Sequence, residues 1–168
     1  DAWVGTLEPV LRQVHVAGER LFVDYAGMSM PVVDSTTGEI RDSQIFVGAL
    51  GASHLLYVDA TWTQALPDWI GAHVRMLAYL GGVPALLVTD NYGTAVLPTR
   101  AYHPRDKAKV ETAVQIVEGE ILAPLRHTVF HSLAALNQAL ALGRERVNDR
   151  PFQKLAGSRR SVFEATER

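Results

Sequence analysis

The sequence PALLVTDNYGTAVLPTRAYHPRDKAKVE, residues 84–111, decides the fold that we expect. It runs from the apolar segment PALLVT into Asp90 and Asn91, and then through Pro104 into a helix that carries Glu111. A short, near-continuous apolar run is typical of a strand that is buried on both faces, parallel to its neighbour and covered by helices. A carboxylate at the tip of such a strand and another on a following helix can share one metal site if a third acid lies nearby.

Asp24, in the segment RLFVDYA, is the candidate for this third acid. From Arg20 the apolar residues follow a period of two, which predicts a strand whose alternate side chains point to opposite faces. This alternation places Asp24 on the face of Phe22 and Ala26, opposite Leu21, Val23 and Tyr25. A carboxylate on such a buried face needs a partner.

The first half of the chain predicts an antiparallel meander of three strands. The first strand starts at Arg20 and includes MPVVD, residues 30–34. It ends at a cluster of turn residues at 34–38. EIRDSQIFVGALG, residues 39–51, then returns antiparallel, and HLLYVDATW, residues 54–62, gives the third strand.

The rest of the chain combines helices with two further strands. Apolar residues recur three and four apart from Leu66 to Leu80, so we predict an amphipathic helix that ends at Gly81-Gly82 and has these inner residues: Leu66, Trp69, Ile70, His73, Leu77 and Leu80. The fourth and fifth predicted strands are PALLVT and TAVLP, residues 94–98. A second helix begins at Pro104 and stops at Pro124, with an apolar stripe formed by Val110, Ala113, Val114, Val117 and Ile121. A third helix follows its cap Ser132 with Leu133, Leu136, Leu140 and Val147 inside. A polar, partly basic tail follows from Asn148, with Phe152 and Phe163 as its predicted anchors.

Length and composition fit one domain with a single core. The chain has 168 residues, of which 48% are hydrophobic, and we divide it into a lead-in at 1–19, a core at 20–150 and a C-terminal tail at 151–168. The sequence lacks cysteine, which excludes disulfides and thiolate chemistry, and no apolar run approaches the roughly 20 residues that span a bilayer. A net charge of −2 argues against a dedicated nucleic-acid-binding module but not against a catalytic core, whose own acids lower the charge. Because the chain begins at Asp1, we expect it to be part of a longer protein.

Four segments in this order resemble a known family. They are FVDYAG at 22–27, VTDN at 88–91, PRDKAKVE at 104–111, and RPF followed by GSRRS between 150 and 161. The chain from Gly18 to Glu164 is similar to the integrase-type catalytic core of DDE transposases, and more narrowly to the IstA transposases of bacterial insertion sequences. The resemblance implies an α/β fold of the RNase H-like type, with a mixed five-stranded sheet flanked by helices.

The resemblance also implies a function and its partners. Asp24, Asp90 and Glu111 would form the catalytic, metal-binding triad, with Asp24 bridging two Mg²⁺ or Mn²⁺ ions. The enzyme would be a polynucleotidyl transferase that cleaves DNA 3′ ends and transfers them to target DNA. It would act in the bacterial cytoplasm as a homo-oligomer on transposon ends, with separate DNA-binding domains and an AAA+ ATPase helper. The open alternatives are a nuclease that only hydrolyses DNA and a non-catalytic DNA-binding or assembly domain with the same fold.

One departure from the family concerns the spacing of the acids. In the family, the second Asp and the Glu are separated by a considerably longer stretch that carries a helical crossover, whereas 20 residues lie between Asp90 and Glu111. We therefore expect that a segment after Asn91 is missing from this chain. A continuous chain at this point would argue against a parallel fifth strand and against the reach of Glu111 to the other acids.

Polar residues around the acids have a functional and an ordinary interpretation. Arg105, Lys107 and Lys109 are candidates for contacts to DNA phosphates, or they are solvated helix surface, where Lys107 pairs with Glu111 four residues later. Asn91 either holds a catalytic carboxylate or DNA, or is a turn residue. Arg159 and Arg160 are weaker candidates for such phosphate contacts, because a basic pair in a tail is usually only solvated surface. Three other acids are predicted to face solvent or cap turns: Asp42, Asp59 and Asp68.

Overall fold

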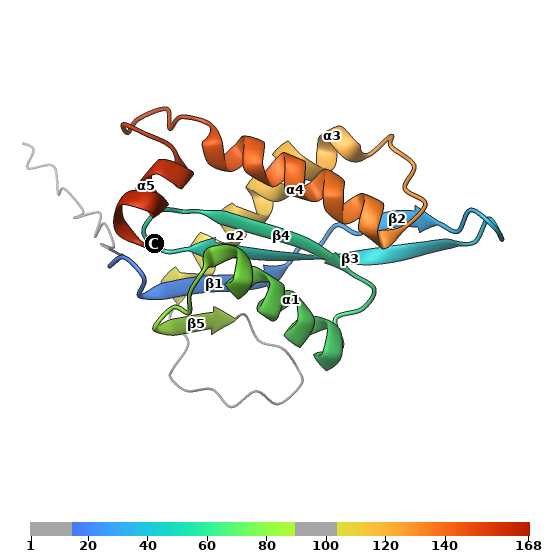
Figure 1. Ribbon diagram of the computed structural model, residues 1–168, viewed down its shortest axis with the longest axis horizontal. Helices are drawn as coiled ribbons and strands as arrows, with labels where there is room; N and C mark the ends of the chain where they lie inside the picture. The colour runs from blue at the N-terminus through green and yellow to red at the C-terminus, as the bar shows by residue number, and fades with distance from the viewer. Residues whose placement is uncertain (1–14, 90–103) are drawn as a thin grey trace, which may run out of the picture.

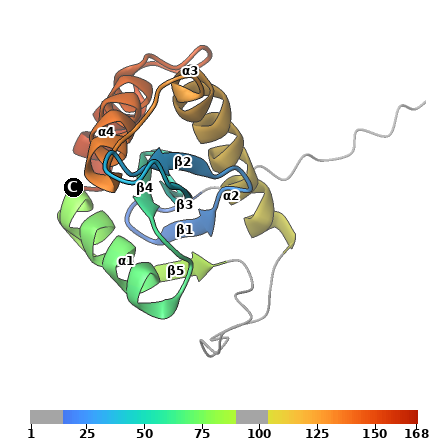
Figure 2. The same ribbon diagram turned by 90° about the vertical axis from the view of Figure 1, so that its right-hand side faces the viewer.

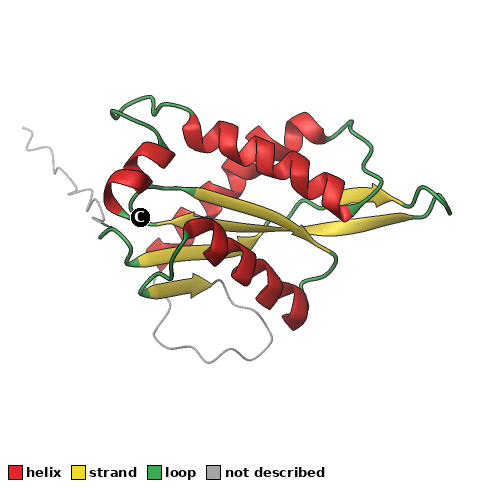
Figure 3. Ribbon diagram, in the orientation of Figure 1, coloured by secondary structure: helices red, strands yellow, loops and turns green. Residues whose placement is uncertain are grey.

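A central mixed sheet lies between two layers of helices (Figures 1 and 2). The computed structural model describes residues 15–89 and 104–168, with side chains from residue 108 onward in the second range. The strands, yellow in Figure 3, are β1 (Arg20–Tyr25), β2 (Met30–Val33), β3 (Ile40–Leu50), β4 (Leu56–Thr61) and β5 (Leu86–Thr89). The helices are α1 (Leu66–Leu80), α2 (Pro104–Val117), the π-helical turn η1 (Glu118–Leu122), α3 (Ala123–Leu125), α4 (Leu133–Asp149) and α5 (Arg159–Thr166). The α/β class and the five-stranded mixed sheet flanked by helices are thus confirmed.

The antiparallel meander is confirmed, with β3 as its centre. The second half of β3 pairs with β1, where Asp24 lies opposite Val47, and its first half pairs with β2, which continues the line of β1. On its other edge β3 pairs antiparallel with β4. Two buried clusters fill the faces of the sheet. One contains Leu21, Val23 and Tyr25 with residues of α1, and the other contains Val47 with residues of α2 and α4.

Strand β5 pairs with β1 in parallel, as the apolar run predicted, but it is not buried on both faces. Leu86 is 40% exposed and Leu87 is 37% exposed. The prediction of burial was wrong because, among the described residues, β5 is an edge strand whose one hydrogen-bonded neighbour is β1. The predicted fifth strand at 94–98 lies outside the described residues. The fifth strand of the observed sheet is β2.

Helix α1 has the predicted bounds. Its inner face is confirmed for His73 and Leu80, which are buried, and for Trp69 and Leu77, which pack against the same cluster, but not for Leu66 and Ile70. Its buried residues are Ala72, His73, Met76 and Leu80, whereas Leu66 and Ile70 are 57% and 48% exposed. Gly81 ends the helix in the left-handed conformation and donates its N–H to the carbonyl of Leu77 (3.0 Å). That geometry is the usual helix termination at glycine, as the Gly81-Gly82 pair predicted.

The helix that starts at Pro104 continues through a π-helical turn and ends at Leu125. Within that turn Ala123 donates its N–H to the carbonyl of Glu118, five residues back. Pro124 has no N–H to offer the carbonyl of Glu120, and Arg146 of α4 donates to that carbonyl instead (2.7 Å). The predicted stripe is confirmed, since Val110, Ala113, Val117 and Ile121 are buried, and Val114 packs beside them.

Helix α4 begins at the predicted cap, where the Ser132 hydroxyl accepts the N–H of Ala135 (3.0 Å). The C-terminal tail was predicted to be polar from Asn148 onward, with Phe163 as one of its anchors, and this anchor is confirmed. Asn148 is fully buried, and residues 159–166 form α5, whose Phe163 enters the cluster under α1. Within the described ranges, every helix falls short of the length and hydrophobicity of a membrane-spanning segment.

Candidate active site

Asp24 lies near the end of β1, on the face of the sheet that α2 covers. Its backbone partner on β3 is Val47, and directly paired residues of antiparallel strands point to the same face. Val47 belongs to the buried cluster that also contains Ala113 and Val117 of α2. Asp24 itself is half-buried, and its Oδ1 accepts the backbone N–H of Tyr25 (2.8 Å). The carboxylate is therefore oriented by its own strand, beneath α2.

The parallel register of β5 and β1 brings a second position to the same edge. Val23, directly before Asp24, pairs with Thr89, the last residue of β5. Asp90 and Asn91 follow Thr89 in the sequence but lie outside the described residues. Because parallel strands in register end at the same edge of a sheet, the end of β5 lies beside the end of β1 that carries Asp24, and Asp90 as a partner of Asp24 stays a prediction.

Two contacts fix the direction of α2 along β1. Near its start, Lys109 Nζ donates to the carbonyl of Gly51 (2.6 Å), and Gly51 donates its N–H to the carbonyl of Arg20 at the beginning of β1 (2.9 Å). Further along, the Oε1 of Glu118 accepts the N–H of Met28, just beyond the end of β1 (3.3 Å). Helix α2 therefore runs in the same direction as β1 and spans its length.

Along the helix, Glu111 lies between the two contacting residues Lys109 and Glu118. Along the strand, Asp24 lies between the corresponding positions Arg20 and Met28. Glu111 is seven residues before Glu118, about two helical turns, so both carboxylates are on the same side of the helix. Glu118 shows that this side turns toward the end of β1. Glu111 is exposed, next to buried Val110. The fold thus places Asp24 and Glu111 on the same side of the sheet.

Glu118 is a residue that sequence reasoning missed. It was predicted only as part of a helical run, although its spacing of seven from Glu111 is a signal for a shared helix face. Its carboxylate lies at the bend between β1 and β2, where a Cβ on Gly27 would be 4.0 Å from Oε1. Glu118 therefore links η1, the turn that continues α2, to the strand that carries Asp24.

The donor set suits a hard divalent cation. Carboxylate oxygens are the ligands that Mg²⁺ and Mn²⁺ prefer, and the pair contains no sulfur or imidazole that would favour zinc. Among the described residues no three acidic or histidine side chains form a metal-binding group, and Asp90, the third predicted ligand, is not among them. Asp24 and Glu111, the two described acids, suit such an ion because both are carboxylates and both lie on the side of the sheet that α2 covers.

Lys109 points away from the acids, to the turn between β3 and β4. Besides its bond to Gly51, its Nζ lies 3.1 Å from Nε2 of His54. Burial lowers the pKa of Lys109 to about 8. Burial, and then the charge of Lys109, lowers the pKa of His54 to about 4, so its imidazole is neutral at physiological pH. Of the other predicted DNA contacts, Arg105 and Lys107 lie on α2 with side chains outside the described residues.

Among the other acids, the prediction for Asp59 was wrong. Asp59 is 5% exposed, and its Oδ2 accepts a hydrogen bond from Nε of Arg75 on α1 (2.7 Å). Burial raises the pKa of Asp59, and the guanidinium of Arg75 opposes that rise. Asp68 accepts the N–H of Thr63 (2.8 Å) and so caps a turn as predicted, and Asp42 is exposed as predicted.

Comparison by sequence finds relatives among bacterial mobile elements. The chain is 45% identical, over 96% of its length, to a candidate transposase of Sinorhizobium fredii. It is 43% identical to the candidate transposase of insertion sequence IS408 from Burkholderia multivorans and 44% identical to that of IS1162 from Pseudomonas fluorescens, each over 96% of its length. The chain covers 33–37% of these proteins, about a third of their length. No protein-family model matches the chain.

The aligned region is longer in the relatives. The alignment with the Sinorhizobium protein spans 188 residues, whereas 96% of this 168-residue chain is about 161 residues. The difference, about 27 positions, corresponds to residues that this chain lacks. A longer alignment in the relatives is what the expected missing segment would produce, and its expected position after Asn91 lies outside the described residues.

Comparison by structure finds retroviral integrases. The catalytic core of HTLV-2 integrase, solved with magnesium, superposes with a TM-score of 0.58 at 15% identity and covers 88% of this chain and 97% of that core. A chain of the simian T-cell lymphotropic virus intasome, in complex with a PP2A regulatory subunit, superposes with a TM-score of 0.64 at 14% identity over 90% of this chain and 56% of that one. These likenesses show the fold.

Proposed function

This chain is a relative of the insertion-sequence transposases with the fold of an integrase catalytic core, and we propose that it is the segment that carries their DNA-cleaving and DNA-joining site. The observation that carries the proposal is the placement of Asp24 on β1 and Glu111 on α2 at one side of the sheet, next to the end of β5. In this proposal Asp90 completes the triad at that strand end.

The three carboxylates would hold two Mg²⁺ or Mn²⁺ ions. Two such ions, when bound, activate the attacking oxygen and stabilise the leaving oxygen of an in-line phosphodiester displacement. The magnesium in the HTLV-2 integrase core supports this choice of metal. The contribution of the chain is rigidity, because Asp24 sits on a paired strand with its Oδ1 held by the N–H of Tyr25.

Two displacements of the same type would follow at this site. In the first, a water oxygen bonds to the phosphorus at the transposon end, the bond from phosphorus to the 3′ oxygen breaks, and the freed strand ends in a 3′-hydroxyl. In the second, that 3′-hydroxyl oxygen attacks a target phosphodiester, the target's own 3′ oxygen leaves, and the attacking hydroxyl gives its proton to solvent. The outcome is DNA cleavage followed by strand transfer, catalysed by a polynucleotidyl transferase.

Partners belong to the same proposal. DNA at the transposon end and at the target would contact Arg105, Lys107, Lys109 and Asn91, and Lys109 would first leave its bond to Gly51. Because the chain spans about a third of its relatives, separate DNA-binding domains would hold most of the DNA. A homo-oligomer on paired ends and an AAA+ ATPase helper in the bacterial cytoplasm complete the proposed assembly, and the intasome neighbour supports the oligomer.

The test is metal binding followed by catalysis. We expect Mn²⁺ titrated into the chain to give a saturable calorimetric signal that Asp24→Asn and Glu111→Gln weaken. Cleavage of supercoiled plasmid by the longer protein should fall about 100-fold or more in either variant, because the loss of one electrostatic stabiliser typically lowers catalysis by about 10²–10³. Asp42→Asn, which alters an exposed carboxylate on β3, is the matched control and should change neither signal.

The products separate the alternatives. Joined products from a pre-cleaved DNA end establish strand transfer, whereas cleavage without joining would leave a nuclease. If Mn²⁺ does not bind and the two variants behave like wild type, the chain is a non-catalytic domain and the proposal fails.

A further inference from the structure

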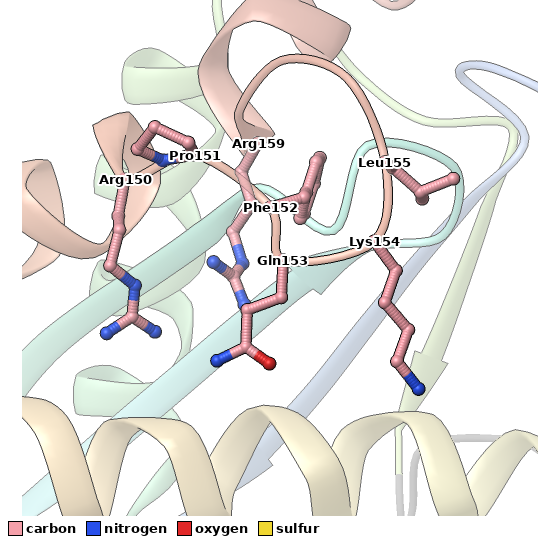
Figure 4. Close-up of a pocket in the computed structure, with 7 residues that line it drawn as sticks. All are labelled: Arg150, Pro151, Phe152, Gln153, Lys154, Leu155 and Arg159. Atoms are coloured by element: carbon pink, nitrogen blue, oxygen red, sulfur yellow. The ribbon is translucent and has the colours of Figure 1, made fainter.

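The loop between α4 and α5 forms a basic pocket that the proposed catalytic site does not use. The pocket has a volume of about 280 Å³ and is lined by Arg150, Pro151, Phe152, Gln153, Lys154, Leu155 and Arg159. Phe152 donates its N–H to the carbonyl of Gly157 (2.9 Å), and Gly157 adopts a positive φ of 85°, so the loop closes on itself. Figure 4 shows the polar ends of Arg150, Gln153, Lys154 and Arg159 extending to the same side of the loop.

Arg159 is held in place by a neighbouring carbonyl and an aromatic ring, but its Nε has no acceptor among the described residues. Its Nη1 donates to the carbonyl of Val147 (3.2 Å), and its guanidinium lies over the ring of Phe152, 5.6 Å from the ring centre. Its Nε is shielded from solvent and has no hydrogen-bond partner in the described part of the chain. Burial lowers the pKa of this guanidinium, and the nearby charge of Arg150 lowers it further. An anion in the pocket would supply the missing acceptor.

Charges around the pocket leave a positive surplus. Arg150 is neutralised by Glu120, whose two carboxylate oxygens lie 2.7 Å from its Nη atoms. Outside the pocket lining, Arg160 is neutralised by Glu145 and Asp149. Within the described ranges, neither Lys154 nor Arg159 forms an ion pair, although the carboxylate of Glu120 partly offsets the charge of Arg159. The pocket therefore presents two cations without ion-pair partners and the amide of Gln153.

We propose that this pocket binds a phosphate of the DNA backbone, as a contact separate from the catalytic acids. A phosphate accepts hydrogen bonds from guanidinium, ammonium and amide groups together. A backbone phosphate fits better than a base, because the aromatic ring of the pocket, Phe152, is covered on one face by Arg159. The ion pair of Arg150 with Glu120 ties the pocket to the helical segment that begins with α2, the helix that carries Glu111. The inference rests on the proposed function, which makes DNA the ligand.

Salt dependence of DNA binding tests the proposal. We would measure the affinity for a labelled DNA duplex at several salt concentrations, without metal and in an Asp24→Asn background, so that no cleavage occurs. The logarithm of the association constant falls linearly with the logarithm of the salt concentration, and each lost phosphate contact makes the slope of this fall less steep by about 0.9. We expect this reduction for Lys154→Met and for Arg159→Met. Arg126→Met, which removes an equal charge at an exposed site next to α3, should leave the slope unchanged.

A second measurement reports on Arg159 directly. In the unmutated chain, the side-chain Nε–H resonance of Arg159 should shift saturably when inorganic phosphate is added, and the corresponding resonance of Arg126 should not. This experiment decides the case if Arg159→Met fails to fold. The proposal is overturned if the slopes of both pocket variants match that of Arg126→Met, or if the Arg159 resonance shifts no more than that of Arg126. A shift with inorganic phosphate but unchanged slopes would overturn DNA as the ligand.

The pocket and the catalytic proposal fail in different experiments. Reduced slopes without metal-dependent cleavage would remove the proposed catalysis and keep the pocket. Cleavage that needs Asp24 and Glu111, together with unchanged slopes, would remove the pocket alone.

Discussion

Asn148 closes the outer edge of strand β4. Its Oδ1 accepts the N–H of Leu56 (3.0 Å), and its Nδ2 donates to the carbonyl of the same residue (2.8 Å). The side-chain amide thus replaces the peptide group of a neighbouring strand. Asn148 is 0% exposed and Leu56 is 1% exposed, so water does not reach these groups. The edge of the sheet is therefore satisfied by a helix, which also keeps other strands from pairing with it.

The replacement Asn148→Leu leaves the N–H and the carbonyl of Leu56 buried without partners. Each such group costs about 1–3 kcal/mol, and the added apolar surface of leucine returns about 1–2 kcal/mol. We therefore expect the free energy of unfolding to fall by about 2–4 kcal/mol. Asn137 makes the same pair of bonds to Ala60 (2.6 and 3.0 Å) but is only partly buried, so Asn137→Leu should lower it by about half as much.

Urea unfolding of the chain, followed by circular dichroism, measures both values. Amide hydrogen exchange gives a local test, because the N–H of Leu56 should lose protection in Asn148→Leu while that of Ala60 keeps it. A loss below about 1 kcal/mol, or equal losses for the two variants, would refute the reasoning that the buried edge groups of β4 depend on Asn148.

Two further predictions concern charged groups. Arg75→Met leaves the buried carboxylate of Asp59 without its partner, and we expect a loss of about 2–3 kcal/mol at neutral pH, less than for a fully buried pair because half of the Arg75 side chain is solvated. Burial raises the pKa of Asp59 in the folded state, so protonation of Asp59 favours folding at low pH and its ionisation disfavours folding as the pH rises. The stability lost in Arg75→Met should therefore be smaller in acid than at neutral pH, which denaturation at two pH values measures. A stability loss that grows in acid would contradict this. Lys109 should titrate at about 8, followed through its side-chain carbon resonance and assigned with Lys109→Arg. The amine of Lys109 keeps its usual pKa of 10.5 in the unfolded state, so between pH 8 and 10.5 the unfolded state binds more protons than the folded state. The free energy of unfolding should therefore rise with pH across that window. A titration midpoint at 10.5 in the folded protein would show that the amine is not buried as described.

Local patterns in the sequence were sufficient for much of the fold. The period of two around Asp24 and the stripe from Val110 to Ile121 predicted a strand and a helix that the structure confirms. Glycine at the end of α1 and Ser132 at the start of α4 marked their boundaries correctly. These features depend on residues a few positions apart, whose geometry is set by the stereochemistry of the chain. The same local patterns predicted that Asp24 lies on a strand and Glu111 on a helix. The family resemblance then implied a metal-binding role for both acids.

Tertiary structure alone decided which distant groups meet. Asn148 was predicted to lie in a polar tail and Asp59 to face solvent, yet both are buried because each meets a partner on another element. The exposure of β5 depends on its position at the edge of the sheet, which an apolar run does not encode. The alignment of α2 with β1, which brings Glu111 to the side of Asp24, likewise rests on the contacts of Lys109 and Glu118. Such pairings depend on the packing of whole elements, since burial and partners are properties of the assembled layers.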